Sequence, residues 1–330
     1  MAERLKLIQQ WLRHDLNLND FSVAPASADA SFRRYFRVSW DGRTAIVMDA
    51  PPGKEDCAPF IDITRRLLQC GVNVPAIRAS NLERGFLLID DLGKDLYLDI
   101  LTAENADQLY SDAIGALIRF QELADTAGLP PYDENLLRQE MALFGDWLLE
   151  RHLRIERTGQ IEAMLADVFQ VLVDSALAQP RVFVHRDYHS RNLLLDARAN
   201  PGIVDYQDAV YGPATYDLVS LLKDCYVNWP RARVLAWVEQ YRNGCRLPAV
   251  MQAADEQFLR WLDLMGVQRH LKASGIFARL CYRDNKAGFI KDIPRTLAYI
   301  LELDPYYPEL QPLAGFIRQR VMPALERRVS

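Results

Sequence analysis

The amino-acid sequence predicts an α+β protein in which a small β-rich lobe precedes a larger, mainly helical lobe. Strand-like runs separated by turn residues fill much of the first ninety residues, and the period becomes helical from about residue 98. A short β-like island at 181–207 interrupts the helices. A chain of 330 residues is long enough for two domains, so we expect lobes over 1–91 and 92–330.

In the first lobe, an amphipathic helix over 1–16 leads into strands that are separated by turn residues. Asp41-Gly42 stands between two alternating runs, which is a strong signal for a two-residue β-hairpin turn. The expected strands are Phe21–Ser27, Phe32–Trp40, Thr44–Ala50 and Phe86–Ile89, and the expected helix is Pro59–Cys70.

In the second lobe, helical periodicity runs from Leu98 to Pro180, with a break at 128–131 (GLPP), and resumes from Asp217 to the end. The island between these helical stretches carries two apolar runs, NLLLD and GIVDYQD. We therefore expect a mainly helical lobe with a β insert.

Composition is that of an ordinary soluble protein, with half of the residues hydrophobic and a quarter charged. The net charge of −5 does not favour nucleic acid as a partner, and no run of 18 apolar residues predicts a membrane span. The first residues lack the apolar centre of a signal peptide, and five irregularly spaced cysteines indicate reduced thiols. We expect a cytoplasmic protein with neither a nucleic-acid nor a membrane partner.

One stretch, VFVHRDYHSRNLLL at 182–195, places a dense polar cluster between two apolar runs. Polar and charged groups that are buried without partners cost free energy. The cluster is therefore either a structural network whose members satisfy one another or a working site.

Oxygen-bearing side chains converge at one end of the expected β insert. If its two strands pair about a centre between Arg198 and Ala199, then Asn192 stands directly opposite Asp205. Asp187 lies on the loop just before this pair. Two carboxylates and an amide oxygen suit a hard cation such as Mg²⁺, which prefers oxygen ligands.

The spacing His185-x-Asp187-x4-Asn192 resembles the catalytic loop of kinases, and an aspartate after an apolar strand, Asp205, resembles their metal aspartate. The chain resembles the aminoglycoside phosphotransferase and choline kinase branch of the protein-kinase-like fold. The resemblance implies ATP and Mg²⁺ as cofactors. It makes Asp187 the group that accepts or orients the acceptor's proton. It makes Asn192 and Asp205 the metal ligands, and His185 a brace of the loop.

The same resemblance implies the nucleotide contacts of the small lobe. A glycine-free segment between the first two strands would lie over the phosphates, and the segment after the Phe86–Ile89 strand would meet the adenine. The residues concerned are Ala28, Asp29, Ala30 and Ser31 for the phosphates, and Ile89, Asp90, Asp91 and Leu92 for the adenine.

The lysine that kinases carry on the third strand is missing, because Met48 stands at the expected position. With a two-residue turn, Tyr35 pairs with Met48, and Arg33 and Arg37 share that face. Arg33 is nearer to the expected phosphate loop and is our candidate replacement, although a solvated arginine explains it equally well. Asp62 is a weak candidate for the acidic partner on the helix.

The segment 268–295 carries seven Lys or Arg and one His against two Asp. If it borders the acceptor site, it favours an anionic acceptor over a polycationic aminoglycoside. A solvated basic surface is the alternative.

Segments such as ADASFRRYFRV and HRDYHSRNLLL are similar to one bacterial subgroup of the family. Its members phosphorylate the anomeric hydroxyl of N-acetylmuramate and N-acetylglucosamine in cell-wall sugar recycling. The lactyl carboxylate of N-acetylmuramate makes Arg269, His270 and Lys272 candidate partners, with Arg269 first because a guanidinium binds carboxylates in a bidentate way. Candidate contacts to the sugar are Glu140, His189, Gln207 and Asp208. We interpret Asp217 as a structural brace.

Two other functions remain open from the sequence. One is a kinase of the same fold for another small alcohol, such as choline, homoserine or an aminoglycoside. The other is a catalytically silent nucleotide-binding module, which the missing lysine would suit.

Overall fold

The computed structural model of the chain describes residues 2–28 and 32–329. Contacts divide the chain into two compact units. Unit 1 comprises Met1–Leu96 with Leu193–Asp208, and unit 2 comprises Tyr97–Asn192 with Ala209–Ser330. The predicted phosphate-loop residues Asp29, Ala30 and Ser31 lie outside the described residues, and so does the side chain of Ala28.

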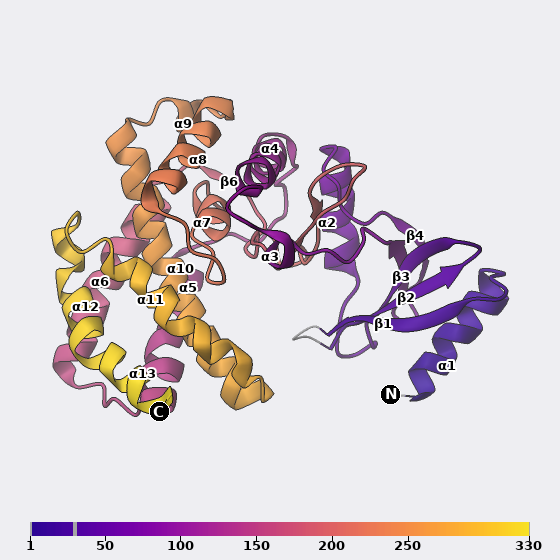
Figure 1. Cartoon of the computed structure of the whole chain (residues 1–330), viewed down its shortest axis with the longest axis horizontal. Helices are drawn as coiled ribbons and strands as arrows, with labels where there is room; N and C mark the ends of the chain where they lie inside the picture. Colours follow the sequence, from indigo (N-terminus) through magenta and orange to yellow (C-terminus); the bar gives the residue numbers. More distant parts are fainter. Residues whose placement is uncertain (1, 29–31, 330) are drawn as a thin grey trace. The chain divides into compact units, whose positions relative to one another are not determined.

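Unit 1 is built on a five-stranded antiparallel sheet with the strand order β1-β2-β3-β5-β4 (Figure 1). Its strands are β1 (Ser22–Ala28), β2 (Arg34–Trp40), β3 (Arg43–Asp49), β4 (Ile77–Asn81) and β5 (Phe86–Asp90). The four predicted strands are confirmed to within two residues at every end. β4 was not predicted, since IRASN has few apolar residues.

The turn between β2 and β3 is the predicted two-residue hairpin. Trp40 pairs with Arg43, and the turn residues Asp41 and Gly42 both have positive φ, 44° and 70°. Two such residues make a type I′ turn, whose twist matches that of the flanking strands. The register pairs Tyr35 with Met48, as expected.

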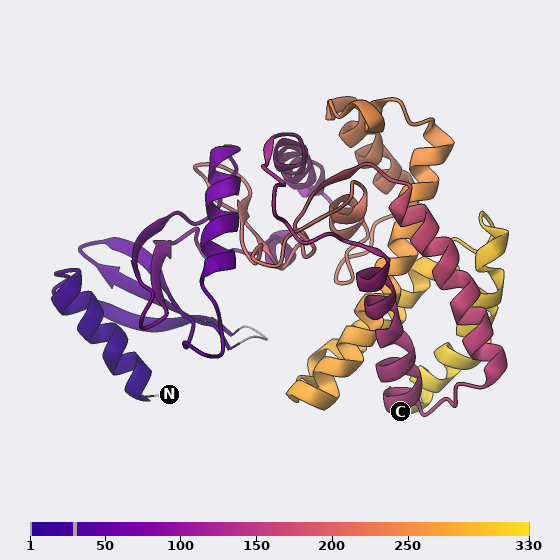
Figure 2. The ribbon, with the colours of Figure 1, turned by 180° about the vertical axis from the view of Figure 1, so that it is seen from behind.

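One face of this sheet is covered by the N-terminal helical segment, α1 (Ala2–Gln10) and η1 (Trp11–Asp15) (Figure 2). Trp11 and Leu12 form an apolar core with Val38 and Val47 of the sheet. Successive side chains of a strand point to opposite faces, so Tyr35, Arg37 and Met48 lie on the other face. The sheet therefore has one face packed on its own helical segment, while Met48 on the other face is also fully buried.

Unit 1 is completed by α2 (Ala58–Gln69) and by a short hairpin from later in the chain, β7 (Leu193–Leu194) with β8 (Gly202–Ile203). Leu193 pairs with Ile203 and Leu194 with Gly202. The pairing is centred on Arg198, because the loop holds an odd number of residues. The prediction that Asn192 stands directly opposite Asp205 is therefore wrong by one residue.

Unit 2 is mainly helical, and the long helix α10 (Asp255–Asp284) is its centre (Figures 1 and 2). It packs against α5, α6, α7, α11, η2 and η3. The other helices of unit 2 are α3 (Tyr97–Ile100), α4 (Ala106–Leu123), α5 (Glu134–Leu143), α6 (Gly159–Leu177), α7 (Tyr216–Leu222), α8 (Arg231–Gly244), α9 (Pro248–Met251), α11 (Ile293–Leu301), α12 (Gln311–Phe316) and α13 (Met322–Val329), with the tighter or wider turns η2 (Phe144–Leu153), η3 (Ala287–Asp292), η4 (Pro308–Leu310) and η5 (Ile317–Val321).

α10 approaches its neighbours closely enough to require small residues. A Cβ placed on Gly275 would lie 2.3 Å from the carbonyl carbon of Leu143, where α5 continues into η2. Real Cβ atoms do not come this close to backbone, so glycine lets the two helices meet.

A two-stranded antiparallel ladder of β6 (Arg181–Val184) and β9 (Val210–Pro213) holds the start of the polar stretch in unit 2. Val184 at the end of β6 is fully buried, and the polar stretch begins at the next residue. Of the helices in the described part of the chain, none combines the length and the apolar character that crossing a membrane requires.

Candidate active site

A buried carboxylate holds the backbone of the loop that follows β6. Asp217 of α7 accepts backbone hydrogen bonds from His185, at 2.6 Å, and from Arg186, at 3.0 Å. Arg186 has a φ of 78°, a left-handed conformation that is unusual outside glycine. Such strain persists only where the surroundings impose it, and both oxygens of Asp217 serve this purpose.

Burial raises the pKa of Asp217 to about 7, although the two backbone donors favour its ionised form. The carboxyl is fully buried and points at the loop backbone. This arrangement is that of a structural brace.

A second buried carboxylate holds the far end of the loop. Asp224 accepts from the backbone N–H of Ser190 at 3.0 Å and from its hydroxyl at 2.5 Å. Asp224 was not predicted, because its contact with Ser190 spans 34 positions and depends on the tertiary fold.

Asp187 sits between these two braces and remains partly exposed. Two side chains of the same loop fix its backbone. The Asp187 N–H donates to His185 Nδ1 at 3.3 Å, and the Asp187 carbonyl oxygen accepts from Asn192 Nδ2 at 2.9 Å. Burial disfavours its charge, yet Lys272, His189, Arg269 and Arg186 together lower its pKa. Asp187 is therefore an ionised, preorganised carboxylate in a cationic surrounding.

Beneath the loop, Glu140 of α5 gathers two cations. It is buried, and its carboxylate pairs with Arg186 at 2.5 Å and with Lys272 at 2.8 Å. Tyr132 and Gln268 donate further hydrogen bonds to it. Burial opposes the charge of Glu140, but Lys272 and Arg186 outweigh this and lower its pKa.

Four buried polar atoms around these residues have no hydrogen-bond partner within the part of the chain that the structure describes. They are Arg186 Nε, His189 Nδ1, Gln268 Oε1 and Arg269 Nε. Buried polar groups are nearly always paired in proteins, so such a group of atoms is typical of a site that binds a polar ligand.

The acceptor residues predicted on α10 do not all face the same surroundings, because successive side chains of a helix point about 100° apart. Lys272 and Gln268 both contact Glu140. Arg269 instead interacts electrostatically with Asp187 and helps to lower its pKa. His270 points elsewhere: its ring stacks on Tyr299 at 4.7 Å, and its Nε2 lies 2.9 Å from the Lys223 carbonyl oxygen. Burial lowers the pKa of His270 to about 3, so it is neutral.

The predicted metal ligands are an amide and a carboxylate, which are hard oxygen donors of the kind that Mg²⁺ binds. Asn192 donates from its amide nitrogen to the carbonyl oxygen of Asp187. Asp205, in unit 1, has a φ of 65° and accepts from Gln207 Nε2 at 2.8 Å. The donor set fits the ion. Asp208 is exposed next to Gln207.

Tyr206 ties the chain after Asp205 to α2 within unit 1. Its hydroxyl shares a 2.8 Å hydrogen bond with Thr64, and its ring stacks on Phe60 with 5.2 Å between centroids. Sequence analysis did not predict these contacts. Through these contacts α2 holds the residue that directly follows Asp205.

The nucleotide residues predicted in unit 1 include the apolar Met48, Ile89 and Leu92 and the acidic Asp90 and Asp91. Met48, Ile89 and Leu92 are buried, and Leu92 packs against Gly202 of the hairpin.

The two acidic positions, Asp90 and Asp91, are both paired with arginines. Asp90 binds Arg78 at 2.5 Å, and Asp91 binds Arg37 through two bonds of 2.6 and 3.0 Å. The carboxylates at this segment therefore serve ion pairs within the unit.

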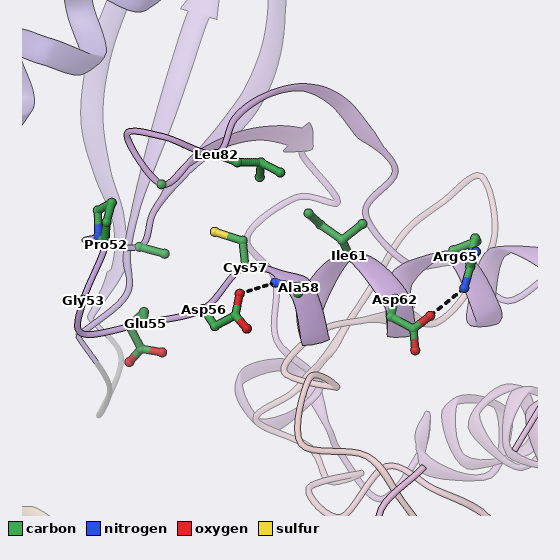
Figure 3. Close-up of a pocket in the computed structure, with 12 residues that line it drawn as sticks. Pro52, Gly53, Glu55, Asp56, Cys57, Ala58, Ile61, Asp62, Arg65 and Leu82 are labelled. Carbon is green, nitrogen blue, oxygen red and sulfur yellow. Dashed lines mark hydrogen bonds and ion pairs between the residues drawn. The ribbon is translucent and has the colours of Figure 1, made fainter. Parts of the chain in front are cut away.

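A pocket of about 590 Å³ opens between the segment after β3, the start of α2 and the β4–β5 turn. Apolar side chains such as Pro52, Ile61 and Leu82 form much of its wall (Figure 3). The carboxylates on its rim are engaged: Asp56 accepts from the Ala58 N–H at 2.8 Å, and Asp62 pairs with Arg65 at 2.6 Å (Figure 3).

Residues 22–262 match the phosphotransferase enzyme family. The chain belongs to this family. The predicted resemblance is thereby confirmed, and the chain is a phosphotransferase enzyme, which implies use of a nucleotide. The match includes the loop from His185 to Asn192 and the following hairpin with Asp205.

Relatives extend the similarity over nearly the whole chain. It is 48% identical over 329 residues to the N-acetylmuramate/N-acetylglucosamine kinase of Pseudomonas putida, with 96% of each chain covered. It is 51% identical over 297 residues to the enzyme of the same name from Pseudomonas aeruginosa, with 89% of this chain and 87% of that one covered.

Solved structures share the fold at low identity. A choline kinase, LicA from Streptococcus pneumoniae, matches with a TM-score of 0.63 at 11% identity, covering 90% of this chain and 98% of that one. An ADP-bound aminoglycoside phosphotransferase matches with a TM-score of 0.59 at 13% identity, covering 89% and 97%. The predicted α+β, protein-kinase-like fold is confirmed.

Proposed function

We propose that the chain is an ATP- and Mg²⁺-dependent kinase that phosphorylates the anomeric hydroxyl of N-acetylmuramate and N-acetylglucosamine. The product is the sugar 1-phosphate, which suits reuse of cell-wall sugars. Two relatives at 48% and 51% identity carry the name of a kinase for these two sugars. The observation that carries the proposal in this chain is the ionised Asp187 on a braced loop among cations.

Asp187 acts on the acceptor hydroxyl. Its carboxylate is charged, partly exposed and fixed at the backbone on both sides, so it accepts or orients the proton of the attacking oxygen. His185 serves the reaction indirectly, because its Nδ1 accepts the backbone N–H of Asp187. Phosphoryl transfer needs little more than positioning and charge neutralisation, so no covalent enzyme intermediate is required.

Asn192 and Asp205 would hold the metal ion through an amide oxygen and a carboxylate. When bound, Mg²⁺ neutralises the charge that develops on the nucleotide phosphates. Gln207 restricts the rotamer of Asp205 by donating to one of its oxygens.

The acceptor site in unit 2 is rich in donors. Arg269, His189 and Arg186 each present a buried nitrogen that has no hydrogen-bond partner among the described residues. These donors suit sugar hydroxyls and an acetamido oxygen, and Arg269 suits the lactyl carboxylate of N-acetylmuramate. Glu140 holds both Arg186 and Lys272 by ion pairs. His270 is neutral and turned to Tyr299, so we assign it no contact with the carboxylate.

The test is phosphoryl transfer from Mg·ATP to N-acetylmuramate, N-acetylglucosamine and glucosamine, with the product identified by phosphorus NMR. A sugar 1-phosphate signal from both acetylated sugars is expected. Arg269→Lys should raise KM for N-acetylmuramate more than KM for N-acetylglucosamine, because only the former carries the carboxylate. ATP hydrolysis without any sugar phosphate, or transfer to choline or homoserine instead, would contradict the proposal.

A further inference from the structure

The catalytic loop carries one cation to which the proposed reaction gives no role. Arg191 directly precedes Asn192, and its side chain is exposed. Its guanidinium lies over two aromatic rings of unit 2, 4.9 Å from the ring centre of Tyr226 and 5.0 Å from that of Phe289. Contacts with two aromatic faces hold the guanidinium in place without using its N–H groups as donors to oxygen.

Both rings are themselves held by the surrounding fold. The Tyr226 N–H donates to Asp224 at 3.0 Å, and the Tyr226 carbonyl oxygen accepts from Arg295 at 2.8 Å. Phe289 of η3 stacks on Phe277 of α10, with 5.7 Å between the ring centres. Tyr226 and Phe289, which we call the aromatic clamp, are therefore positioned before any ligand binds.

One carboxylate holds both the aromatic clamp and the loop that carries Arg191. Asp224 accepts from Ser190 through Oδ2 and from the Tyr226 N–H through Oδ1. Ser190 precedes Arg191, and Asn192, which follows it, is tied to the same loop by its side chain. The backbone on both sides of Arg191 is thus as well fixed as the ring beneath its guanidinium.

A second guanidinium of unit 2 shows what such a clamp does when the chain supplies the anion. Arg233 lies over Trp229 at 4.9 Å and over Trp237 at 5.2 Å. Its Nε donates to the carboxylate of Asp107 at 3.0 Å. In the part of the chain that the structure describes, Arg191 has neither a hydrogen bond nor an ion pair with a carboxylate. The two clamps are built alike, and only that of Arg233 holds an anion of the chain itself.

The carboxylate that interacts electrostatically with Arg191 is committed to another arginine. Asp292 is buried and pairs with Arg295 at 3.4 Å. Such pairing within the chain is common among its arginines. Arg33, predicted from the sequence to replace the missing strand lysine, pairs with Glu55 at 3.1 Å and is only 9% exposed. Arg191 differs in being exposed, clamped by two rings and without such a partner among the described residues.

Arg191 adjoins the donors already proposed for the acceptor. His189, whose buried Nδ1 has no partner among the described residues, meets the Tyr226 ring edge to face with 5.6 Å between centres. Burial lowers the pKa of His189, and the charges of Arg269 and Arg191 lower it further, whereas that of Asp187 opposes them. Two guanidiniums, one buried and one exposed, therefore accompany His189 beside the catalytic carboxylate.

We propose that Arg191, held by the aromatic clamp, is the exposed carboxylate receptor of the acceptor site and makes the enzyme favour N-acetylmuramate over N-acetylglucosamine. This inference rests on the proposed function. The two sugars differ by the lactyl ether that carries the carboxylate, so a residue that binds only this group discriminates between them. A guanidinium can bind a carboxylate through two parallel N–H bonds, and the clamp reduces the entropy cost of ordering the side chain. Arg191 adds to Arg269, which is buried and directs one N–H group to Cys225 Sγ at 3.6 Å.

The test is steady-state phosphorylation of both sugars by the wild type and by Arg191→Met, which keeps a long side chain without its charge. KM for N-acetylmuramate should rise about 10- to 100-fold with kcat unchanged, because a charge-assisted pair is lost. KM for N-acetylglucosamine and KM for ATP should stay as in the wild type. Arg191→Lys should restore only part of the loss, since an ammonium is not bidentate. Phe289→Leu should raise KM for N-acetylmuramate by a smaller factor and add nothing to Arg191→Met.

The methyl ester of N-acetylmuramate is the control on the side of the substrate. It lacks the charge, so the wild type and Arg191→Met should phosphorylate it with the same KM. Arg151→Met is the matched control variant, because Arg151 is an exposed arginine over a single ring, that of Tyr282 at 5.4 Å. An equal loss with both sugars, a loss that persists with the ester, or a rise in KM for ATP would overturn the assignment. So would a loss in Arg269→Lys with none in Arg191→Met, which would leave the carboxylate to Arg269 alone.

The outcome is separable from that of the proposed function. If both sugars yield the 1-phosphate and Arg191→Met handles them as the wild type does, only the receptor assignment fails. If neither sugar is phosphorylated, the proposed function fails, and calorimetric titration with N-acetylmuramate decides the assignment: an affinity that falls in Arg191→Met supports it, and absence of binding overturns it. Thermal unfolding is recorded for every variant. Should Arg191→Met not fold, Arg191→Lys decides by the same comparison of acid and ester.

Discussion

The catalytic loop of unit 2 and the sheet of unit 1 hold their charges in different ways. In unit 2 the carboxylates of Asp217, Asp224 and Glu140 are buried, and each accepts at least two hydrogen bonds or ion pairs. In unit 1 the buried Asp49 binds two arginines, but other arginines reach carboxylates where solvent remains close, as in Arg78–Asp90, whose arginine is 61% exposed.

The difference indicates how strongly ion pairs fix the conformation of each region. Removing one partner of a buried charge leaves the other uncompensated, which costs about 3–5 kcal/mol, whereas exposed pairs contribute about 0–1 kcal/mol. The loop of unit 2 is therefore fixed before any ligand arrives. The sheet of unit 1 depends for its shape on strand pairing, and its surface ion pairs add little.

The largest effect is expected at Asp187. Asp187→Asn keeps the side-chain shape but removes the ability to accept a proton, so turnover should fall about 10²- to 10⁴-fold. The measurement is the rate of sugar 1-phosphate formation at saturating ATP and sugar, with Asp304→Asn, which breaks a surface ion pair with Arg318, as the control. Turnover within a few-fold of wild type would show that this carboxylate does not act on the acceptor.

Next comes Glu140→Gln, which leaves Arg186 and Lys272 without their buried counter-charge. We expect the free energy of unfolding to drop by about 3–5 kcal/mol at pH 7, measured by urea titration. The folded pKa of Glu140 lies below its ordinary 4.5, so its stabilisation is present above that value and is lost as pH falls through the folded pKa. The gap between wild type and variant should narrow in acid, and a constant gap would refute this account.

A smaller loss is expected for Asp217→Asn. An amide has one acceptor oxygen, so one of the two buried N–H groups of His185 and Arg186 loses its partner, at a cost of about 1–3 kcal/mol. Stability and kcat should fall together, because Arg186 can then leave its left-handed conformation. Asp217→Glu serves as the matched variant that keeps both oxygens, and loss of kcat with no loss of stability would point to direct chemistry instead.

The smallest effect is expected in unit 1. Arg78→Gln breaks an exposed ion pair with Asp90 and should change the free energy of unfolding by less than about 1 kcal/mol. The effect should shrink further in high salt, because exposed charges are screened. A loss as large as that of Glu140→Gln would remove the contrast between the two regions.

Local signals explain what the sequence predicted well. Asp41-Gly42 specified a hairpin turn, and with it the pairing of Tyr35 with Met48. β4 and β9 were not predicted, since IRASN is half polar and VYGP contains glycine and proline, so tertiary pairing with β5 and β6 decides them. The hairpin register was wrong by one residue because loop parity cannot be read from a turn-rich segment.

The same limit applies to the candidate site. His185, Asp187 and Asn192 lie within eight positions of one another, so the sequence alone was enough to predict them as a group. Asp217 and Asp224, which hold the loop, lie about thirty positions downstream on or after α7, and their contacts exist only once that helix packs. His270 was grouped with Arg269 because they are neighbours in sequence, yet neighbouring helical positions face different ways.

Unit 1 is discontinuous along the chain, since the hairpin at Leu193–Asp208 belongs to it although unit 2 lies on both sides in sequence. A fragment that ends at residue 96 would lack the strand pair on which Leu92 packs and the partner of Asn73, whose carbonyl oxygen accepts from Ile203. Dissecting this enzyme into independently expressed halves at the boundary after Leu96 would therefore expose apolar surface on the smaller piece. Joining Leu96 to Leu193 through a short linker would be the way to obtain that piece with its own contacts intact.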